Sequence, residues 1–432
     1  MKTKRKNVDV ITLGCSKNLV DSEFLIKQFN AGGFSVKHDP ETPSGNIAII
    51  NTCGFIGDAK EESVNLILEF AEARKRGDIE KLYVMGCLSQ RYFEQLGAEI
   101  PEVDKFYGKF DWHNLTEELG MQYRVDLANE RTLTTPGHYA YLKIAEGCNR
   151  TCSYCAIPII TGKYKSHSIN SLVDQAHILA SQGVKELQLI AQDLTYYGID
   201  LYKKPLLAQL TDELSKIDGI EWIRLHYAYP AGFPKDLPQL MAQNPKVCRY
   251  LDLALQHISD PMLNRMRRNF SKKQTYKLID DLRSTVPGLH LRTTLITGHP
   301  GESEQDFKEL LNFVEQVKFE RLGVFTYSHE EDTYAYNNYK DDIPQELKQE
   351  RANIIMESQN RISRELNEKK SGKLLKVIMD RKEGDFFIGR TEFDSPEVDP
   401  EVVVETDKKL EIGSFYNVTV TGAEDYDLKA HI

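Results

Sequence analysis

The stretch EGCNRTCSYCAIP, from Glu146 to Pro158, places three cysteines in the spacing C-x3-C-x2-C. Cys148, Cys152 and Cys155 follow an apolar run that predicts a strand beginning at Tyr139. Iron–sulfur cubanes are usually held by about four thiolates, and structural zinc also takes about four ligands. Three local thiols therefore predict either a cluster with one iron open to a small ligand or a zinc knuckle with a distant fourth ligand. The rarity of this spacing and its strand-end position favour the cluster.

An iron with an open position can bind and reduce a sulfonium such as S-adenosylmethionine. The cysteine triad supplies the anchoring thiolates for such an iron, and Tyr154 directly precedes the last of them. The ring of Tyr154 is a candidate to pack against the adenine of that cofactor. The triad therefore predicts a site for S-adenosylmethionine as well as for a cluster.

Three more cysteines are spread over the first part of the chain. Cys15 in TLGCSKN, Cys53 in INTCGF and Cys87 in VMGCLSQ each follow a short apolar run that predicts a strand. Because the carboxyl ends of parallel strands meet at one edge of a sheet, the fold is expected to bring these thiols together. One such cysteine is more often an inert buried thiol, but the same placement three times predicts a second three-thiolate cluster. The seventh cysteine, Cys248, has no partner pattern and is expected to be a small core or surface residue.

The 432 residues exceed the size of one ordinary core and fall into three blocks. Residues 6–123 alternate strand and helix patterns, which predicts an α/β domain with a Rossmann-like parallel sheet. Residues 134–366 hold six further strand–helix units, which predict an incomplete (β/α)6 barrel with its function in the loops after the strands. Residues 368–432 read as short strands between turns, which predicts a small antiparallel β-barrel.

The charge and hydrophobicity of the chain argue against a non-specific nucleic-acid-binding protein and against a membrane protein. The net charge of −10 is a poor footprint for non-specific nucleic-acid binding. No apolar run is long enough to cross a membrane, and the basic start MKTKRKNVDVITLG lacks a signal-peptide core. The protein is therefore expected to be cytoplasmic, where cysteines serve as metal ligands or catalytic thiols rather than as disulfides.

Taken together, the cysteine motifs and their surroundings make the chain similar to the radical S-adenosylmethionine methylthiotransferases. The similarity covers nearly the full length and implies a radical-SAM barrel followed by a TRAM-type barrel. Within this family, the chain most resembles the branch that modifies an aspartate of small-subunit ribosomal protein twelve. The runs that carry it are LGCSKNLVDSE (13–23), NTCGFIGDAKEES (51–63), MGCLSQRY (85–92), LDLALQHISDPMLNRMRR (251–268) and RLGVFTYSHEEDTYA (321–335).

The resemblance implies a mechanism with two 4Fe-4S clusters and S-adenosylmethionine. The cluster on the triad from Cys148 to Cys155 cleaves the cofactor to a radical that removes hydrogen from the β-carbon of the aspartate. The cluster on Cys15, Cys53 and Cys87 holds or donates the sulfur. A second S-adenosylmethionine supplies the methyl group, and an electron donor is required.

Two further runs match the cofactor-binding loops of the family. AQDLTYYG follows the second barrel strand, where Gln192 and Asp193 are candidates to contact the amino-acid part or the ribose of the cofactor. TGHPGE follows the fifth strand, where Gly298 and Gly301 would let the backbone approach the cofactor. Ordinary strand-end turns with solvated polar groups explain both runs equally well.

The chain also departs from the family pattern after the triad. The family has an arginine where IPIITGKYKSHS places Thr161, and often another where it places His167. The roles of those arginines are therefore in doubt here. Lys163 and Lys165 are the candidates to compensate.

The charge of the C-terminal block bears on the substrate. Residues 368–432 contain 10 Lys/Arg and 15 Asp/Glu, a net of 10 − 15 = −5. Such a surface repels phosphate and attracts a basic ribosomal protein, so RNA binding by this barrel is not favoured, although a merely solvated acidic face is as good an explanation. The aromatic residues of the block are expected in its core: Phe386, Phe387, Phe393, Phe415 and Tyr416.

Two other functions stay open from the sequence. One is a transfer-RNA adenosine methylthiotransferase, which belongs to the same family. The other is an iron–sulfur electron carrier without catalysis.

Overall fold

The computed structural model describes residues 7–432, so the basic start Met1–Lys6, with the first residue of the predicted N-terminal block, lies outside the described residues. The N-terminal domain is a five-stranded parallel sheet in the order β2-β1-β3-β4-β5. The edge strands β2 and β5, which the sequence did not predict, are short and only partly buried. The elements of this domain are β1 Asn7–Thr12, α1 Ser16–Ala31, β2 Ser35–His38, β3 Ile47–Thr52, α2 Gly57–Arg76, β4 Lys81–Gly86, α3 Cys87–Arg91, α4 Phe93–Glu99, β5 Lys105–Phe106 and α5 Trp112–Glu118.

The central domain is an open six-stranded sheet in the order β13-β12-β11-β10-β9-β6, with every pair parallel. Its strands, β6 Tyr139–Lys143, β9 Glu186–Ile190, β10 Trp222–Ala228, β11 Val247–Leu253, β12 His290–Thr297 and β13 Arg321–Thr326, are the six predicted. The helices between and after them are α7 Ile169–Ser181, α9 Leu207–Ser215, α10 Leu237–Gln243, α12 Lys272–Thr285, α13 Glu304–Val317 and α15 Gln345–Glu368. The shorter elements are η1 Val125–Leu127, β7 Ala145–Glu146, α6 Ile157–Thr161, β8 Lys165–Ser166, η2 Leu194–Tyr196, α8 Ile199–Tyr202, α11 Asp260–Arg265 and α14 Tyr334–Asn338.

The core of the central domain lies between this sheet and its helices. All residues of β6 and β9 are buried, as expected for parallel strands covered by helices. Helix α13 begins at a capping box between Ser303 and Asp306, and its apolar face packs on the sheet through Leu310, Phe313 and Val314. The carboxyl ends of the strands remain the place where loops can carry chemistry.

The C-terminal domain is a closed barrel in the order β14-β15-β16-β18-β17. Its strands are β14 Leu374–Glu383, β15 Phe386–Thr391, β16 Val402–Glu405, β17 Phe415–Ala423 and β18 Leu428–His431. All pairs are antiparallel except β16 with β18, which closes the barrel in parallel. The predicted fold class is confirmed. Of the five aromatic residues expected in the barrel core, Phe387 is buried there and Tyr416 packs against it. Phe386 is 43% exposed because it lies at the turn end of β15, and the half-buried Phe393 and Phe415 pack on His290 and Trp222 of the central domain.

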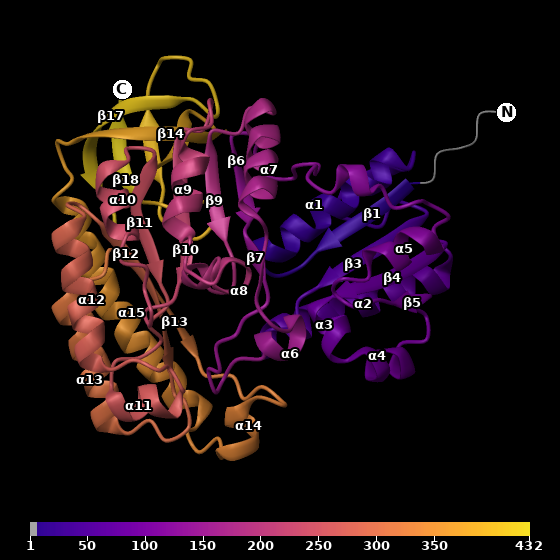
Figure 1. The fold of residues 1–432 in the computed structure, drawn as a ribbon, viewed down its shortest axis with the longest axis horizontal. Helices are drawn as coiled ribbons and strands as arrows, with labels where there is room; N and C mark the ends of the chain where they lie inside the picture. The colour runs from indigo at the N-terminus through magenta and orange to yellow at the C-terminus, as the bar shows by residue number, and fades with distance from the viewer. Residues whose placement is uncertain (1–6) are drawn as a thin grey trace.

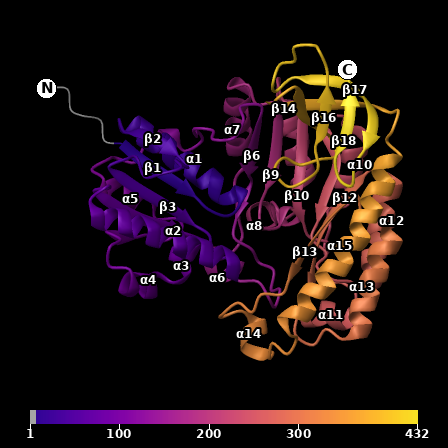
Figure 2. The same cartoon turned by 180° about the vertical axis from the view of Figure 1, so that it is seen from behind.

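The C-terminal barrel covers the amino ends of the central strands (Figures 1 and 2), and buried ion pairs join the two domains. Glu186 accepts hydrogen bonds from Arg224 Nε at 2.9 Å and Nη2 at 2.8 Å. The Nη2 of Arg390, from the C-terminal barrel, lies 2.9 Å from the same carboxylate. Arg321 donates to Asp394 at 3.1 and 2.5 Å. We call this set of contacts the floor of the central sheet.

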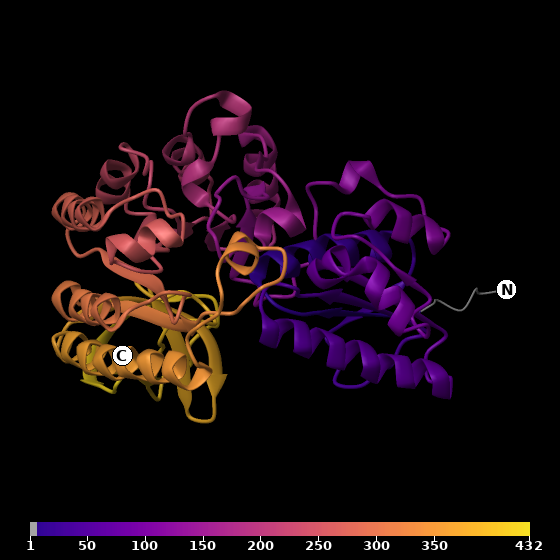
Figure 3. The same ribbon diagram turned by 90° about the horizontal axis from the view of Figure 1, so that it is seen from below.

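The N-terminal domain lies beside the central domain, with the turn around α14 near their junction when seen from below (Figure 3). Helix α1 forms part of the contact. Its Val20 packs in one buried cluster with Tyr139, Tyr141 and Ile190 of the central strands. The carboxyl ends of β1, β3 and β4 thereby face the loops that follow the central strands.

Candidate functional site

The three N-terminal thiols lie directly after neighbouring parallel strands, as predicted. Cys15 precedes α1, Cys53 follows β3 and Cys87 begins α3. Gly14 has a φ of +91°, and a Cβ atom on it would lie 2.7 Å from Cys53 Sγ. A glycine is needed here because only its missing side chain lets the two cysteine-bearing loops meet.

A buried lysine lies beside these thiols. Lys109 Nζ donates to Asn18 Oδ1 at 2.9 Å and to Asp21 Oδ2 at 2.8 Å. Asn18 Oδ1 also lies 3.6 Å from Cys87 Sγ. The lysine therefore places a fixed positive charge next to the thiols.

The three thiols differ in how readily they ionise. Desolvation acts to raise the pKa of Cys15, but the charges of Lys17 and Lys109 hold that pKa below its usual value. Burial raises the pKa of Cys53 to about 12 and also raises that of Cys87. Because metals bind the thiolate form, binding at these two residues has to release their protons.

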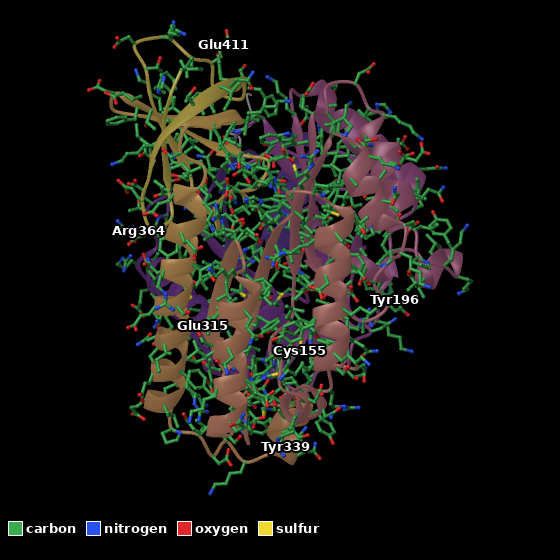
Figure 4. The ribbon with its side chains drawn as sticks, turned by 90° about the vertical axis from the view of Figure 1, so that its left-hand side faces the viewer. Cys155, Tyr196, Glu315, Tyr339, Arg364 and Glu411 are labelled. Carbon is green, nitrogen blue, oxygen red and sulfur yellow. The ribbon has the colours of Figure 1, made fainter. Side chains whose placement is uncertain are left out.

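The triad occupies the loop between β7 and α6, in the half of the central domain opposite the C-terminal barrel, as the positions of Cys155 and Glu411 show (Figure 4). Arg150 donates its backbone N–H to Cys148 Sγ at 3.4 Å, and Arg268 Nη1 donates to Cys152 Sγ at 3.3 Å. Burial raises the pKa of Cys148 to about 11 and raises that of Cys155 as well. The triad thus combines one buried thiol, Cys148, with two half-buried ones, and hydrogen-bond donors lie beside two of its sulfurs.

The two sets of cysteines come from different domains but approach each other. Cys87 packs in one cluster with Ala156 and Ile160, which directly follow the triad. The carboxylate of Asp21, which accepts from Lys109, also accepts from Lys143 of β6, and Lys143 pairs with Glu146. A chain of buried charges therefore runs from one set of cysteines to the other.

The loop after β13 holds the two domains together at the same place. Glu330 Oε2 lies 2.8 Å from both Lys60 Nζ and Arg91 Nη1 of the N-terminal domain. Ala335 N donates to Ser153 O within the triad loop at 2.7 Å. This segment, Ser328–Ala335, contacts both cysteine-bearing regions.

Of the predicted cofactor contacts, Tyr154 and Gln192 lie half-buried after their strands. The Tyr154 hydroxyl accepts from Arg268 Nη1 at 3.2 Å, and its ring lies edge-on to His299, with centroids 6.4 Å apart. Asp193 is already engaged, because it accepts from Arg150 Nε at 2.6 Å and from Thr195.

The two predicted glycines face protein side chains. A Cβ atom on Gly298 would lie 2.2 Å from Cγ of Lys348, and one on Gly301 would lie 2.8 Å from Nε of Arg265. Both have positive φ, of +75° and +82°. Their missing side chains therefore accommodate Lys348 and Arg265 as well as the turn.

Thr161 and His167 stand where the family pattern has arginines, and neither forms a hydrogen bond to a triad sulfur within the described structure. Thr161 donates its hydroxyl to Ile157 O at 2.9 Å, inside α6. Desolvation and the charge of Lys143 lower the pKa of His167. Lys163 and Lys165 are exposed. Arg268 and Arg150 bring guanidinium groups to the triad instead.

Sequence reasoning missed four residues of the site: Lys109, Arg150, His299 and Arg268. Arg150 lies inside the triad run, and Arg268 ends the quoted motif LDLALQHISDPMLNRMRR, so the sequence carried a signal for both. Lys109 gave no signal, because only the folded chain brings it to cysteines that are distant in sequence.

The donor sets fit iron–sulfur clusters better than single ions. Within residues 7–432, no group of three His, Cys, Asp or Glu side chains is arranged to hold one metal ion. Each site instead offers three thiols, the usual ligands of iron–sulfur clusters, and Gly14 keeps two of the N-terminal loops in contact. We therefore take both cysteine sets as candidate cluster sites.

Three family descriptions match separate parts of the chain. Residues 142–314 match the Radical SAM superfamily, residues 7–108 the Uncharacterized protein family UPF0004, and residues 372–432 the TRAM domain. Ribosomal protein uS12 methylthiotransferase RimO of Bacteroides thetaiotaomicron is 61% identical over 430 residues, 99% of each chain. The protein of that name from Parabacteroides distasonis is 58% identical over 425 residues, 98% of each chain.

Solved structures share the fold at low sequence identity. The radical S-adenosylmethionine methyltransferase TsrM from Kitasatospora setae has a TM-score of 0.55 at 15% identity, over 74% of this chain and 73% of that one. The cobalamin-dependent S-adenosylmethionine radical enzyme OxsB has a TM-score of 0.53 at 12% identity, over 80% of this chain and 56% of that one.

Proposed function

The chain belongs to the RimO family of ribosomal protein uS12 methylthiotransferases, and from that premise we propose that it adds a methylthio group to the β-carbon of a uS12 aspartate. The observation that supports this most is the meeting of two three-cysteine sets from two domains. A radical enzyme that also transfers sulfur needs two such sites next to one substrate. The packing of Cys87 against Ala156 and Ile160, in the segment after Cys155, supports this proposal.

We propose that each cysteine set holds one 4Fe-4S cluster with an iron left open. Bound there with S-adenosylmethionine, the clusters supply the radical and sulfur chemistry. Cys148, Cys152 and Cys155 anchor the first cluster in the loop between β7 and α6. Tyr154 and Gln192 are the candidates to orient the cofactor, whereas Asp193 acts through Arg150, which it holds beside the triad.

The buried charges between the two sets fix their relative position. Lys109 and Lys143 neutralise Asp21 in the interior, so this contact between the domains needs no water to be satisfied. The loop with Glu330 covers the neighbouring edge.

We further propose that uS12 is recognised as a basic protein rather than through RNA. The groove between β14, β15 and β16 of the C-terminal barrel mixes Lys382, Lys408 and Lys409 with Asp385, Glu405 and Asp407, so it forms no continuous basic surface. The floor contacts also occupy part of the barrel's surface. An electron donor and a cytoplasmic setting complete the proposal, and within residues 7–432 no helix is long and apolar enough to span a membrane.

The three predicted blocks, residues 6–123, 134–366 and 368–432, are our proposed domain boundaries. They enclose the two parallel sheets and the closed barrel, respectively, as separate sheets.

Mass spectrometry of uS12 and of hydrolysed transfer RNA from a deletion strain tests the proposed substrate. We expect the methylthio group to disappear from the aspartate of uS12 and to persist in the transfer RNA. Loss from the transfer RNA alone would establish the other branch of the family. To exclude a passive electron carrier, the reduced protein is incubated anaerobically with S-adenosylmethionine, and deoxyadenosine must form.

A further inference from the structure

One buried arginine differs from all the others in what lies beside it. Within residues 7–432, six arginines are buried, and five have a carboxylate oxygen within 4.0 Å. The sixth, Arg268, is 3% exposed and forms no ion pair with any described carboxylate. The five pairs are Arg131–Glu23, Arg224–Glu186, Arg321–Asp394, Arg351–Glu302 and Arg390–Glu186.

The guanidinium of Arg268 faces the cysteine triad instead. Its Nη1 donates to Cys152 Sγ at 3.3 Å and to the Tyr154 hydroxyl at 3.2 Å, and its Nη2 donates to Ala254 O. Its buried Nε has no hydrogen-bond partner among the residues that the structure describes. The side chain is held in place by the Tyr229 ring, whose centroid lies 4.2 Å away and whose hydroxyl donates to Arg268 O at 2.6 Å.

A buried cation without a counter-ion is costly, so such a group usually has an anion as its partner. The sulfur that accepts a hydrogen bond from this guanidinium belongs to Cys152, a predicted cluster ligand. Hydrogen bonds to the sulfurs of an iron–sulfur cluster, and the charge around it, set its reduction potential. A positive charge favours the reduced cluster, because the reduced state carries one more negative charge.

We propose that Arg268 is a positioning residue for the cluster of the triad, which fixes the Cys152 sulfur and makes that cluster easier to reduce. This inference rests on the proposed function in one respect, namely that the triad holds a cluster. Arg268 orients the ligand sulfur through a charge-assisted hydrogen bond and brings the anionic cluster a positive charge that no carboxylate of residues 7–432 neutralises.

Arg150 shows why the role falls to Arg268. Its guanidinium lies 4.0 Å from the same Tyr229 ring, but its charge is already compensated by Asp193 at 2.6 Å. Arg267 provides the matched control, because it adjoins Arg268 in sequence and rests on the Tyr334 ring at 4.3 Å.

The test is a redox titration of the reconstituted full-length chain, followed by electron paramagnetic resonance without S-adenosylmethionine. Cys15, Cys53 and Cys87 are replaced by Ala in every sample, so that one cluster gives the signal. At a fixed potential, Arg268→Met is expected to lower the ratio of reduced to oxidised cluster about tenfold, which equals about 59 mV for one electron. Arg267→Met is expected to change it less than twofold.

Arg268→Lys keeps the cation but not the planar fork, and is expected to retain most of the ratio with a broadened signal. It also keeps the test valid if Arg268→Met does not fold. Equal ratios in Arg268→Met and Arg267→Met would overturn the inference. So would an unchanged ratio with weaker binding of S-adenosylmethionine, because Arg268 would then serve the cofactor instead.

The iron content of the parent sample separates the two levels of the proposal. A parent without iron on the triad contradicts the proposed function itself. A reducible cluster in the parent whose reduction potential does not change when Arg268 is replaced contradicts the inference alone.

Discussion

At the amino ends of the central strands, Arg224, Arg321 and Arg390 each lie beside a carboxylate, whereas at the carboxyl ends Arg268 lies beside a cysteine sulfur. The floor also holds a cysteine, Cys248, but that thiol packs among aromatic and aliphatic side chains. Arginines and cysteines thus lie at both ends of the central sheet, but the residues that neighbour them differ between the two ends.

This difference separates structural from functional charge. Where every buried ion has its partner within the protein, nothing remains for a ligand to satisfy, and the contacts serve to attach the C-terminal barrel. Where a guanidinium lies beside a cysteine sulfur and, among the described residues, has no carboxylate partner, an anionic ligand can supply the missing charge. The three predictions below test this division, from the largest expected effect to the smallest.

Replacing one cysteine at each end is expected to give the largest contrast. Cys152→Ala removes a ligand of the triad and should abolish both the cluster signal and deoxyadenosine formation. Cys248→Ala should keep full iron content and activity and cost about 1 kcal/mol of stability, as an ordinary core substitution does. Iron analysis and deoxyadenosine assays measure both, and loss of iron in Cys248→Ala would break the comparison.

Substitutions in the floor are expected to lower the stability of the fold rather than to change the reaction. Glu186→Gln leaves Arg224 buried without its counter-ion and should lower the free energy of unfolding by about 3–5 kcal/mol. The matched control is Glu213→Gln, whose partner Lys216 lies 2.9 Å away on the surface, and it should cost less than about 1 kcal/mol. Denaturant unfolding compares them. Equal costs for both variants would show that the floor pair does not stabilise the fold.

The contact between domains is expected to give a smaller effect. Desolvation acts to raise the pKa of Glu330, but bonds from Lys60, Ser328 and Arg91 hold it below its usual value. The carboxylate therefore stabilises the contact above its unfolded pKa of about 4.3, and this contribution is lost as the pH falls through the lower folded pKa.

Glu330→Gln should weaken this contact by about 2 kcal/mol at neutral pH. We expect faster amide hydrogen exchange in Ser328–Ala335 and less methylthio transfer per deoxyadenosine formed. Glu331→Gln, whose carboxylate is exposed and bonded to Tyr92, is the control and should change exchange little. Unchanged exchange in both variants would mean that other contacts hold the domains together.

The strands that precede the cysteines and the placement of those cysteines could be predicted because both follow local rules. The apolar runs before Cys15, Cys53 and Cys87 give buried parallel strands, and parallel strands end at one edge. The short strands β2, β5 and β18 carry too few apolar residues for such a pattern.

The remaining features depend on contacts between residues that are distant in sequence. Asp193 is polar and follows a strand, yet its carboxylate is already engaged by Arg150. Gly298 follows the expected turn, but the space it leaves is filled by Lys348 of α15. Only the folded structure shows that Arg268, among residues 7–432, has no carboxylate within ion-pair distance.

The central claim, two cysteine sites with separate tasks, is tested most directly by one anaerobic assay with uS12, S-adenosylmethionine and a reductant. Deoxyadenosine and methylthio-aspartate are measured in the same reaction for the unaltered chain and for the variant with Cys15, Cys53 and Cys87 replaced by Ala. The account predicts that the variant still forms deoxyadenosine but transfers no methylthio group. Methylthio transfer at the unaltered rate would contradict it.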